Sequence, residues 1–161
     1  MTVKTEKSSQ LRVLVTAGAS GIGRVIAESF AQTGARLHIC DIADAALGEA
    51  KKTHPTWGVS RCDVSQSDQV AGLFEEVGNN FGGLDVLINN AGIAGPTGGV
   101  EEITADDWRR TVDINLNGQF YCANRAVPLL KQSPNASIIC ISSVAGRLGY
   151  AYRTPYAATK W

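Results

Sequence analysis

The sequence predicts a doubly wound α/β fold, in which helices cover both faces of a parallel β-sheet. Short runs that are apolar throughout alternate with longer segments of helical spacing, and this alternation is typical of such a sheet. The 161 residues, of which 44% are hydrophobic and 19% charged, suffice for one folding unit with a real core. We therefore expect one domain over residues 11–161, after a polar and flexible arm at residues 1–10.

Five strands are expected, each bounded by glycine, proline or polar residues. They fall at residues 11–16, 36–40, 58–62, 84–88 and 137–141. The first, fourth and fifth are continuous apolar runs of strand length. The second is rich in β-forming residues and ends in Asp41, whereas the third is the weakest of the five.

Helices are expected between the strands, at residues 22–32, 43–52, 65–79, 104–131 and from residue 154 onward. Gly34 follows the first helix as a stop signal, and Pro55 closes the second. Ser65 and Ser67 offer N-caps for the third, whose apolar side chains share one face.

The last two helices carry their own start signals. Thr104 with Asp107 resembles a capping box at the start of the long fourth helix, which we expect to bend near residues 115–118. Pro155 suits the first turn of the last helix.

The charge balance points to a small-molecule partner. Fifteen basic residues match fifteen acidic ones, so the chain has no excess positive charge that would attract nucleic acid or an anionic membrane. No apolar run approaches the ~20 residues of a membrane span, and residues 1–10 lack the apolar stretch of a signal peptide. We expect a cytoplasmic protein.

The cysteines and histidines do not predict a metal site. Cys40, Cys62, Cys122 and Cys140 are widely spaced, without a C-x-x-C pair or a nearby histidine cluster. Three of them end strand-like runs, so we expect buried, reduced thiols.

A glycine-rich turn, TAGASGIG at residues 16–23, joins the first strand to the first helix. Backbone N–H groups at a helix start can hold a pyrophosphate there, because glycine brings no interfering Cβ atom. A flexible turn is the plainer alternative, but the strand-to-helix context favours a dinucleotide. The cofactor-binding residues expected in this turn are Gly18, Ser20, Gly21, Ile22 and Gly23.

Asp41 ends the second strand, eighteen positions after Gly23, where an acidic side chain meets the adenosine ribose in dinucleotide-binding folds. A carboxylate accepts hydrogen bonds from a ribose diol and repels a 2′-phosphate. Ser20 supplies no charge to neutralise such a phosphate, so the sequence favours NAD over NADP. Alternatively, Asp41 only begins the next turn.

These motifs, with others in the same order, resemble the short-chain dehydrogenase/reductase family and its Rossmann fold over residues 11–161. Asn89-Asn90-Ala91-Gly92 is similar to the family's NNAG motif, and Cys62-Asp63-Val64 to the segment whose aspartate contacts adenine. The resemblance implies cofactor contacts for Asp63, Val64, Asn90, Ala91 and Gly92. It also implies a catalytic tetrad of Asn115, Ser143, Tyr156 and Lys160, the last two also contacting the cofactor. The interval to Tyr156 favours Ser143 over Ser142.

Two features depart from the family pattern. Ala17 stands where the family's turn usually has its first glycine, and Gly18 follows one step later. The sequence also ends one residue after Lys160, whereas the family places further strands and a substrate-covering segment beyond the lysine. We therefore expect these C-terminal strands to be absent and the fifth strand to be an edge.

The predicted chemistry is hydride transfer between NAD(H) and an alcohol or ketone, with a tyrosine moving the proton. Tyr156 and Lys160 are four apart on a helix and share one face. An ammonium ~4 Å from a phenolate is worth about 4 kcal/mol at an effective dielectric of ~20, which favours the anion. By resemblance, Ser143 holds the substrate oxygen and Asn115 a water beside Lys160.

Two functions from different classes stay open. The chain is part of a complete oxidoreductase, or it is a dinucleotide-binding or assembly module that does not turn over substrate. The filled tetrad favours the oxidoreductase. By resemblance we expect a homo-oligomer, a dimer or tetramer formed through the long helices.

Overall fold

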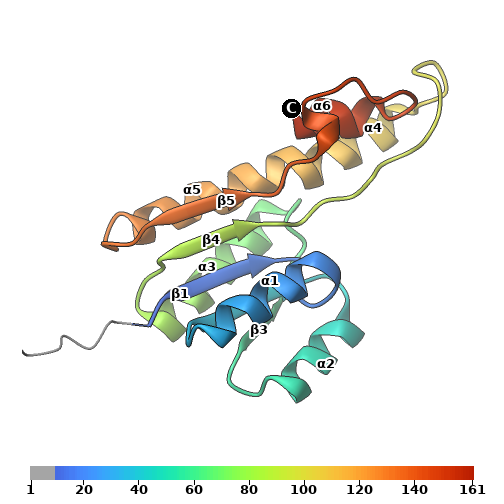
Figure 1. Cartoon of the computed structure of the whole chain (residues 1–161). Helices are drawn as coiled ribbons and strands as arrows, with labels where there is room; N and C mark the ends of the chain where they lie inside the picture. Colours follow the sequence, from blue (N-terminus) through green and yellow to red (C-terminus); the bar gives the residue numbers. More distant parts are fainter. Residues whose placement is uncertain (1–9) are drawn as a thin grey trace, which may run out of the picture.

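A computed structural model describes residues 10–161 and confirms the doubly wound α/β fold. Its five strands are all parallel and lie in the order β3-β2-β1-β4-β5 (Figure 1). The strands are β1 (Arg12–Thr16), β2 (Arg36–Asp41), β3 (Gly58–Arg61), β4 (Val86–Asn89) and β5 (Ser137–Cys140). The predicted arm at residues 1–10 falls, apart from Gln10, outside the described residues.

Helices cover both faces of the sheet, as the apolar strands predict (Figure 1). They are α1 (Gly21–Gln32), α2 (Asp44–Thr53), α3 (Ser67–Phe81), α4 (Ala105–Val112), α5 (Gly118–Leu130) and α6 (Thr154–Lys160). One core joins α1 and α2 to residues such as Val15 and Ile39. A second core, on the opposite face, joins α3 and α5 to residues such as Leu14 and Leu87.

The strand order reverses at β1, which pairs with β2 on one side and with β4 on the other. In Figure 1 the arrowheads of β1 and β4 point toward the same end of the sheet, where α6 and the start of α1 lie. A crevice outside the carboxyl ends of the strands, at such a switch point, is where open α/β sheets bind ligands. The topology therefore places the predicted site residues at one end of the molecule.

The predicted bend in the long helix is one turn of π-helix, η1 (Asp113–Asn117), between α4 and α5. Asn115 lies within this turn and is fully buried. Single π-turns inside α-helices are frequent at functional sites, because they re-aim side chains locally. At the start of α4, the Thr104 hydroxyl accepts the backbone N–H of Asp107 at 3.1 Å, as the capping signal predicts.

Two expectations are wrong in detail. Neither Ser65 nor Ser67 caps α3, since Gln66 occupies the N-cap position without a side-chain bond. The Ser65 hydroxyl instead donates to Asp63. Cys140 is exposed, whereas the other three cysteines are buried.

The expectation that the fifth strand forms an edge is confirmed: all four residues of β5 are exposed, although it is apolar like the inner strands. β5 pairs only with β4 and forms the edge of the sheet. Its position among the described residues, rather than its composition, decides its burial. A short 3-10 helix, η2 (Val144–Gly146), follows this strand.

Candidate functional site

The turn after β1 has the tight backbone that the glycines predict, with one exception to glycine's usual role. Ala17 adopts a left-handed φ of +48°, a conformation that L-residues other than glycine rarely take. Gly21 follows with a φ of +53°. A Cβ on Gly18 would lie 2.8 Å from the Ile39 side chain. The departure from the family pattern at Ala17 is thus accommodated by strain at that residue, and the turn is kept.

A side-chain clamp ties this turn to the end of β4. The Thr16 hydroxyl accepts the backbone N–H groups of Asn90 and Ala91, each at 3.0 Å. In return, the Asn90 side-chain amide donates to the carbonyls of Thr16 at 2.9 Å and Ala17 at 3.1 Å. The predicted cofactor-binding residues of the NNAG segment are therefore locked onto the glycine turn. Thr16 holds both Asn90 and Ala91 in place, and the sequence analysis did not include it among the cofactor-binding residues.

Gly23 lies where the first turn of α1 approaches this clamp most closely. A Cβ there would overlap the Ala17 carbonyl and lie 2.6 Å from the Asn90 amide nitrogen. Only glycine fits, because the neighbouring atoms are backbone and a fixed side chain. α1 itself begins without a side-chain cap at Ser20, so its first N–H groups have no side-chain acceptor.

A hollow of about 370 Å³ lies beside the turn and is called the Asp41 hollow. It is lined by Ala17, Ser20, Asp41, Ile42, Cys62, Asp63, Val64, Ser65, Ala91, Gly92, Ile93, Arg110 and Ile114. Six of the predicted cofactor-binding residues are in this set: Ser20, Asp41, Asp63, Val64, Ala91 and Gly92.

The two carboxylates of the Asp41 hollow are held by the backbone. Asp41 accepts the N–H groups of Ile42 at 2.8 Å and Ala43 at 3.2 Å, and a longer bond of 3.3 Å from Ala19. Asp63 accepts both the N–H and the hydroxyl of Ser65. Asp41 therefore does begin the next turn, as the plainer alternative has it, and its carboxylate also faces the hollow.

Buried thiols lie under the Asp41 hollow. Cys62 lines it, and Cys40 donates a hydrogen bond to the Cys62 sulfur, which raises the pKa of Cys40 and lowers that of Cys62. Burial raises the pKa of Cys122 to about 12. Desolvation keeps Cys122 a thiol at neutral pH, and it acts as a small apolar core residue.

A second hollow, of about 320 Å³, continues from the first and is called the Lys160 hollow. It shares Ala17, Ser20, Gly92 and Ile93 with the Asp41 hollow. Its lining adds Ile22, Gly23, Asn90, Ala94, Ile141, Ser142, Tyr156 and Lys160. The two hollows together form a groove over the start of α1. One end contains Asp41, expected at the adenosine ribose, and the other contains Lys160, expected at the nicotinamide end of a dinucleotide.

Lys160 is buried at the inner end of this groove. Its ammonium donates to the Ile141 carbonyl at 2.8 Å and lies 5.8 Å from the centre of the Tyr156 ring. A Cβ on Gly92 would lie 3.3 Å from the same ammonium and 3.2 Å from Asn115 Oδ1. Gly92, Asn115 and Lys160 thus converge without intervening side chains.

Asn115 is fixed from both sides. Its Oδ1 accepts the Ile93 N–H at 2.8 Å, and its Nδ2 donates to the Ile93 carbonyl at 2.9 Å and to the Thr159 hydroxyl at 3.0 Å. The π-turn thereby connects the loop after β4 to α6. Thr159, which adjoins Lys160, is a second positioning residue that the sequence analysis missed.

The two serines after β5 have different environments. The Ser142 hydroxyl donates to the Lys160 carbonyl at 2.7 Å and so ties the end of α6 to the sheet. Ser143 instead lines a third hollow, of about 510 Å³, together with Tyr156. This Ser143 hollow shares Ala94 and Tyr156 with the Lys160 hollow. Ser142 and Ser143 therefore line different hollows, each of which also contains Tyr156.

The structure thus brings most of the predicted residues to three adjoining hollows. Gly18, Gly21 and Asn115 do not line the three hollows, and their contacts or dihedral angles shape the backbone around them. Thr16, Ser142 and Thr159 were missed because their contribution is a contact between distant segments. No local pattern marks such a contact, although each residue directly adjoins a predicted motif.

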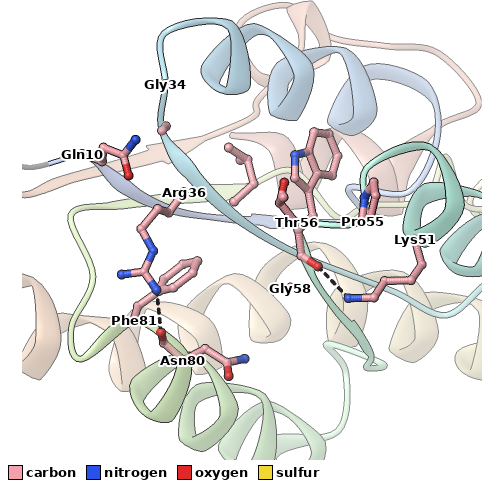
Figure 2. Close-up of a pocket in the computed structure, with 12 residues that line it drawn as sticks. Gln10, Gly34, Arg36, Lys51, Pro55, Thr56, Gly58, Asn80 and Phe81 are labelled. Atoms are coloured by element: carbon pink, nitrogen blue, oxygen red, sulfur yellow. Dashed lines mark hydrogen bonds between the residues drawn. The ribbon is translucent and has the colours of Figure 1, made fainter.

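A larger hollow, of about 580 Å³, lies far from these residues, at the amino ends of β2 and β3 (Figure 2). Its two cations are already engaged: Arg36 donates to the Asn80 carbonyl at 2.7 Å, and Lys51 to the Trp57 carbonyl at 3.1 Å. Arg36 also lies over the Phe81 ring, 4.8 Å from its centre. No predicted site residue lines it, and open α/β sheets bind ligands at the opposite end.

Two features are absent from residues 10–161. No helix among them has the length and apolar character to span a bilayer. No cluster of three or more His, Cys, Asp or Glu side chains in this range is arranged to hold a metal ion.

Comparison with known proteins places this site in a family. The model of the short chain dehydrogenase family matches residues 11–161. A 3beta-hydroxysteroid dehydrogenase of Mediterraneibacter gnavus is 38% identical over 152 residues, which cover 92% of this chain and 55% of that protein. The L-fucose dehydrogenase of Bos taurus is 36% identical over 92% of this chain and 54% of its own.

Solved structures agree with the sequence relatives. The ligand-free aldohexose dehydrogenase of Thermoplasma acidophilum superposes with a TM-score of 0.85 at 35% identity, over 94% of this chain and 56% of its own. The chain therefore spans little more than half the length of these relatives. Since the family model matches nearly the whole chain, the protein belongs to the short-chain dehydrogenase/reductase family.

Proposed function

We propose that this chain is the cofactor-binding and proton-transfer part of an NAD-dependent oxidoreductase acting on an alcohol or ketone. The observation that carries the proposal is the position of Tyr156. This residue lines both the Lys160 hollow and the Ser143 hollow, so it stands where a dinucleotide groove meets a separate cavity. A proton donor at that junction is what carbonyl reduction requires.

The groove fits a dinucleotide on three counts. Gly23 leaves no Cβ where α1 closes on the turn, and the first N–H groups of α1 have no side-chain cap. Asp41 presents a carboxylate at the far end. A nicotinamide dinucleotide supplies or accepts the hydride when bound, and the protein handles the proton.

Tyr156 would give the proton to the substrate oxygen in reduction and remove it in oxidation. Ser143, in the same hollow, would hold that oxygen by a hydrogen bond and so keep it within reach of the phenol. The Lys160 ammonium lies 5.8 Å from the centre of the Tyr156 ring, so both side chains face the same proposed site.

Lys160 and Asn115 form the inner wall of the proposed site. Lys160 would bind the nicotinamide ribose through its ammonium, which already donates to Ile141 and has further N–H groups to offer. Asn115 supports it from the π-turn through Thr159 and Ile93. We propose that a water held beside Asn115 exchanges the proton with solvent.

The choice of NAD over NADP rests on Asp41. Its carboxylate is nearly buried and faces the Asp41 hollow, where a 2′-phosphate would meet a like charge. We expect Asp41→Ala to weaken the preference for NAD, and an unchanged ratio of kcat/KM for the two cofactors would remove this argument.

The relatives support an alcohol or ketone substrate without fixing it. They are named for a steroid, a deoxy sugar and an aldohexose. We propose in addition that the protein is cytoplasmic and forms a dimer or tetramer. Trp108, Leu116 and Phe120 are exposed apolar side chains on α4, η1 and α5 respectively, which suits such an interface.

The test is a spectrophotometric screen of alcohols and ketones with NAD and NADH, followed by Tyr156→Phe. We expect the variant to lose turnover and to keep NADH binding, measured by the fluorescence of the bound cofactor. Phenylalanine keeps the ring and removes only the proton donor. If binding and turnover were lost together, the role given to Tyr156 would be wrong.

A second candidate is a dinucleotide-binding or assembly module without turnover. The observation in its favour is the exposure of all four residues of β5, the strand next to the proposed catalytic residues. Saturable NADH binding, with no oxidation of the cofactor by any ketone in the screen, would support this candidate over the oxidoreductase.

A further inference from the structure

We propose that Arg153 binds a carboxylate of the substrate, so that the proposed oxidoreductase acts on a hydroxy acid or keto acid. The inference rests on the proposed function and deepens it by naming a substrate class. It comes from the charge and hydrogen bonding of the Ser143 hollow, where the reacting oxygen would lie.

The Ser143 hollow is mostly apolar. Val144, Leu148 and Tyr150 contribute to its walls, with Ser143 and Tyr156 at the proposed reaction centre. Arg153 is the only residue of its lining that carries a formal charge at neutral pH, and no carboxylate lines it. A ligand that enters therefore meets one positive charge within an apolar wall.

That charge has no counter-ion in the described part of the chain. No Asp or Glu oxygen among residues 10–161 lies within ion-pair distance of Arg153. Several other arginines share this property, but none of them lines the Ser143 hollow. Arg153 donates instead to two neutral acceptors, the carbonyls of Ala94 at 3.1 Å and Gly95 at 3.2 Å. The guanidinium therefore keeps its positive charge available to an anionic ligand.

Both recorded bonds come from one nitrogen, Nη1. A guanidinium has five N–H groups, so Nε and Nη2 still have donors to offer, and neither has an acceptor within residues 10–161. These two nitrogens form the edge that binds a carboxylate through two parallel hydrogen bonds. The bonds from Nη1 would fix the plane of the group while that edge receives the ligand.

The backbone holds Arg153 at this place. Arg153 is the N-cap residue of α6, three positions before Tyr156. The preceding residue, Tyr152, has a left-handed φ of +60°, and its carbonyl accepts the Gly98 N–H at 3.0 Å. Residues 94–98 and the start of α6 are thus tied by three bonds around one strained residue. Strain of this kind persists where the surroundings fix it, and it is frequent at ligand sites.

The cations of the two neighbouring hollows, Arg110 and Lys160, do not line the Ser143 hollow. Lys160 is buried, donates to Ile141 and lines the Lys160 hollow, but not the Ser143 hollow. Recognition of an anionic group beside Ser143 and Tyr156 therefore falls to Arg153.

The experiment compares matched acid and neutral ligands on the full chain in the presence of NADH. Binding of cyclohexanecarboxylate and cyclohexanecarboxamide is measured by calorimetry, and turnover is measured with 4-oxocyclohexanecarboxylate and its methyl ester. We expect the acid of each pair to be favoured at least about tenfold, as charge-assisted bonds to a guanidinium allow. Arg153→Gln should bring both ratios close to one, and Arg153→Lys should keep part of the preference.

Arg147→Gln is the matched control, because it removes the same charge from an exposed neighbour that does not line the hollow. It should leave both ratios as they are in the unchanged protein. Equal binding of the acid and the amide by the unchanged protein would overturn the proposal, whether or not any variant folds. Turnover of the neutral ester without preference for the acid would overturn it too, while leaving the oxidoreductase function intact.

Discussion

The half of the sheet that would bind the cofactor and the half that would carry the chemistry are stabilised in different ways. Ile88 and Ile139 show the contrast, since they are register partners on neighbouring strands and have the same side chain. Ile88, on β4, is 1% exposed, whereas Ile139, on β5, is 42% exposed. The inner strands are held by packing on both faces, and β5 is not.

The proposed catalytic half relies on discrete hydrogen bonds instead. Lys160 bonds to Ile141, Ser142 bonds to the Lys160 carbonyl, and Asn115 bonds to Thr159. The stabilisation from packing is spread over many atomic contacts, whereas one substitution removes a hydrogen bond between two groups entirely. The comparison therefore teaches that close packing of backbone and the Thr16–Asn90 clamp together set the turn after β1, whereas the exposed strand β5 and the helix α6 are tied by a few polar contacts.

The largest effect is expected from Gly23→Ala, in the close-packed half. The added Cβ would overlap the Ala17 carbonyl, a backbone atom that cannot move without opening the turn. We expect a loss of more than about 4 kcal/mol in the free energy of unfolding, or failure to fold, together with loss of NADH binding. Urea unfolding and cofactor fluorescence measure the two.

Gly48→Ala is the control for this prediction. Gly48 lies in α2 with open space around its Cα, so alanine should stabilise the helix by about 0.5–1 kcal/mol. If Gly23→Ala behaved like Gly48→Ala, the close packing of the turn would be refuted.

The comparison itself is tested by Ile88→Ala against Ile139→Ala. We expect Ile88→Ala to cost about 2–5 kcal/mol, because it opens a cavity between packed layers. Ile139→Ala should cost less than about 1 kcal/mol in the 161-residue chain, since its side chain is already in contact with solvent. Equal costs would mean that β5 is covered in solution.

A pH effect is expected next, from His38 in the packed half. Burial lowers the pKa of His38 to about 4, with Glu76 opposing the shift. His38 Nε2 bonds to Ser60, and Nδ1 has no partner among the described residues. Between pH 6.5 and 4 the unfolded chain binds a proton that the folded one does not, so stability falls as pH falls through this window. The loss is at most about 3 kcal/mol.

The measurement is urea unfolding at several pH values between 7 and 4, with His38→Gln as the comparison, because glutamine does not titrate. The contribution of His38 is the difference between the two pH profiles. Profiles with the same slope would show that His38 is not kept neutral by burial.

The smallest effect is expected from Ala17→Gly, which relieves the strained residue of the turn. A left-handed φ costs an L-residue about 1–2 kcal/mol, and glycine avoids this cost. Glycine also makes the unfolded chain more flexible, which destabilises the folded protein by about 0.5–1 kcal/mol. We therefore expect a net stabilisation of up to about 1 kcal/mol, measured by thermal unfolding. Ala19→Gly, where φ is not positive, should destabilise instead.

The sequence predicted the elements of this fold because each is encoded by neighbours in the chain. The turn after β1, the cap at Thr104 and the proline at the start of α6 are all patterns of a few residues. The caps of α3 were predicted wrongly, since Ser65 bonds to Asp63 in preference to the helix. The bend near Asn115 was predicted, but not that it is a π-turn.

By itself the sequence determined the α/β class, the family resemblance and the order of the motifs, because local composition and spacing carry that information. Only the tertiary structure decided that Thr16 clamps Asn90, that Ser142 ties α6 while Ser143 faces a hollow, and that Arg153 meets the loop after β4. It also decided that β5 is exposed although its residues match the buried strands. The reason is physical. Burial and hydrogen bonding depend on which segments, far apart in the chain, come into contact, and the pattern of a single sequence does not specify those contacts.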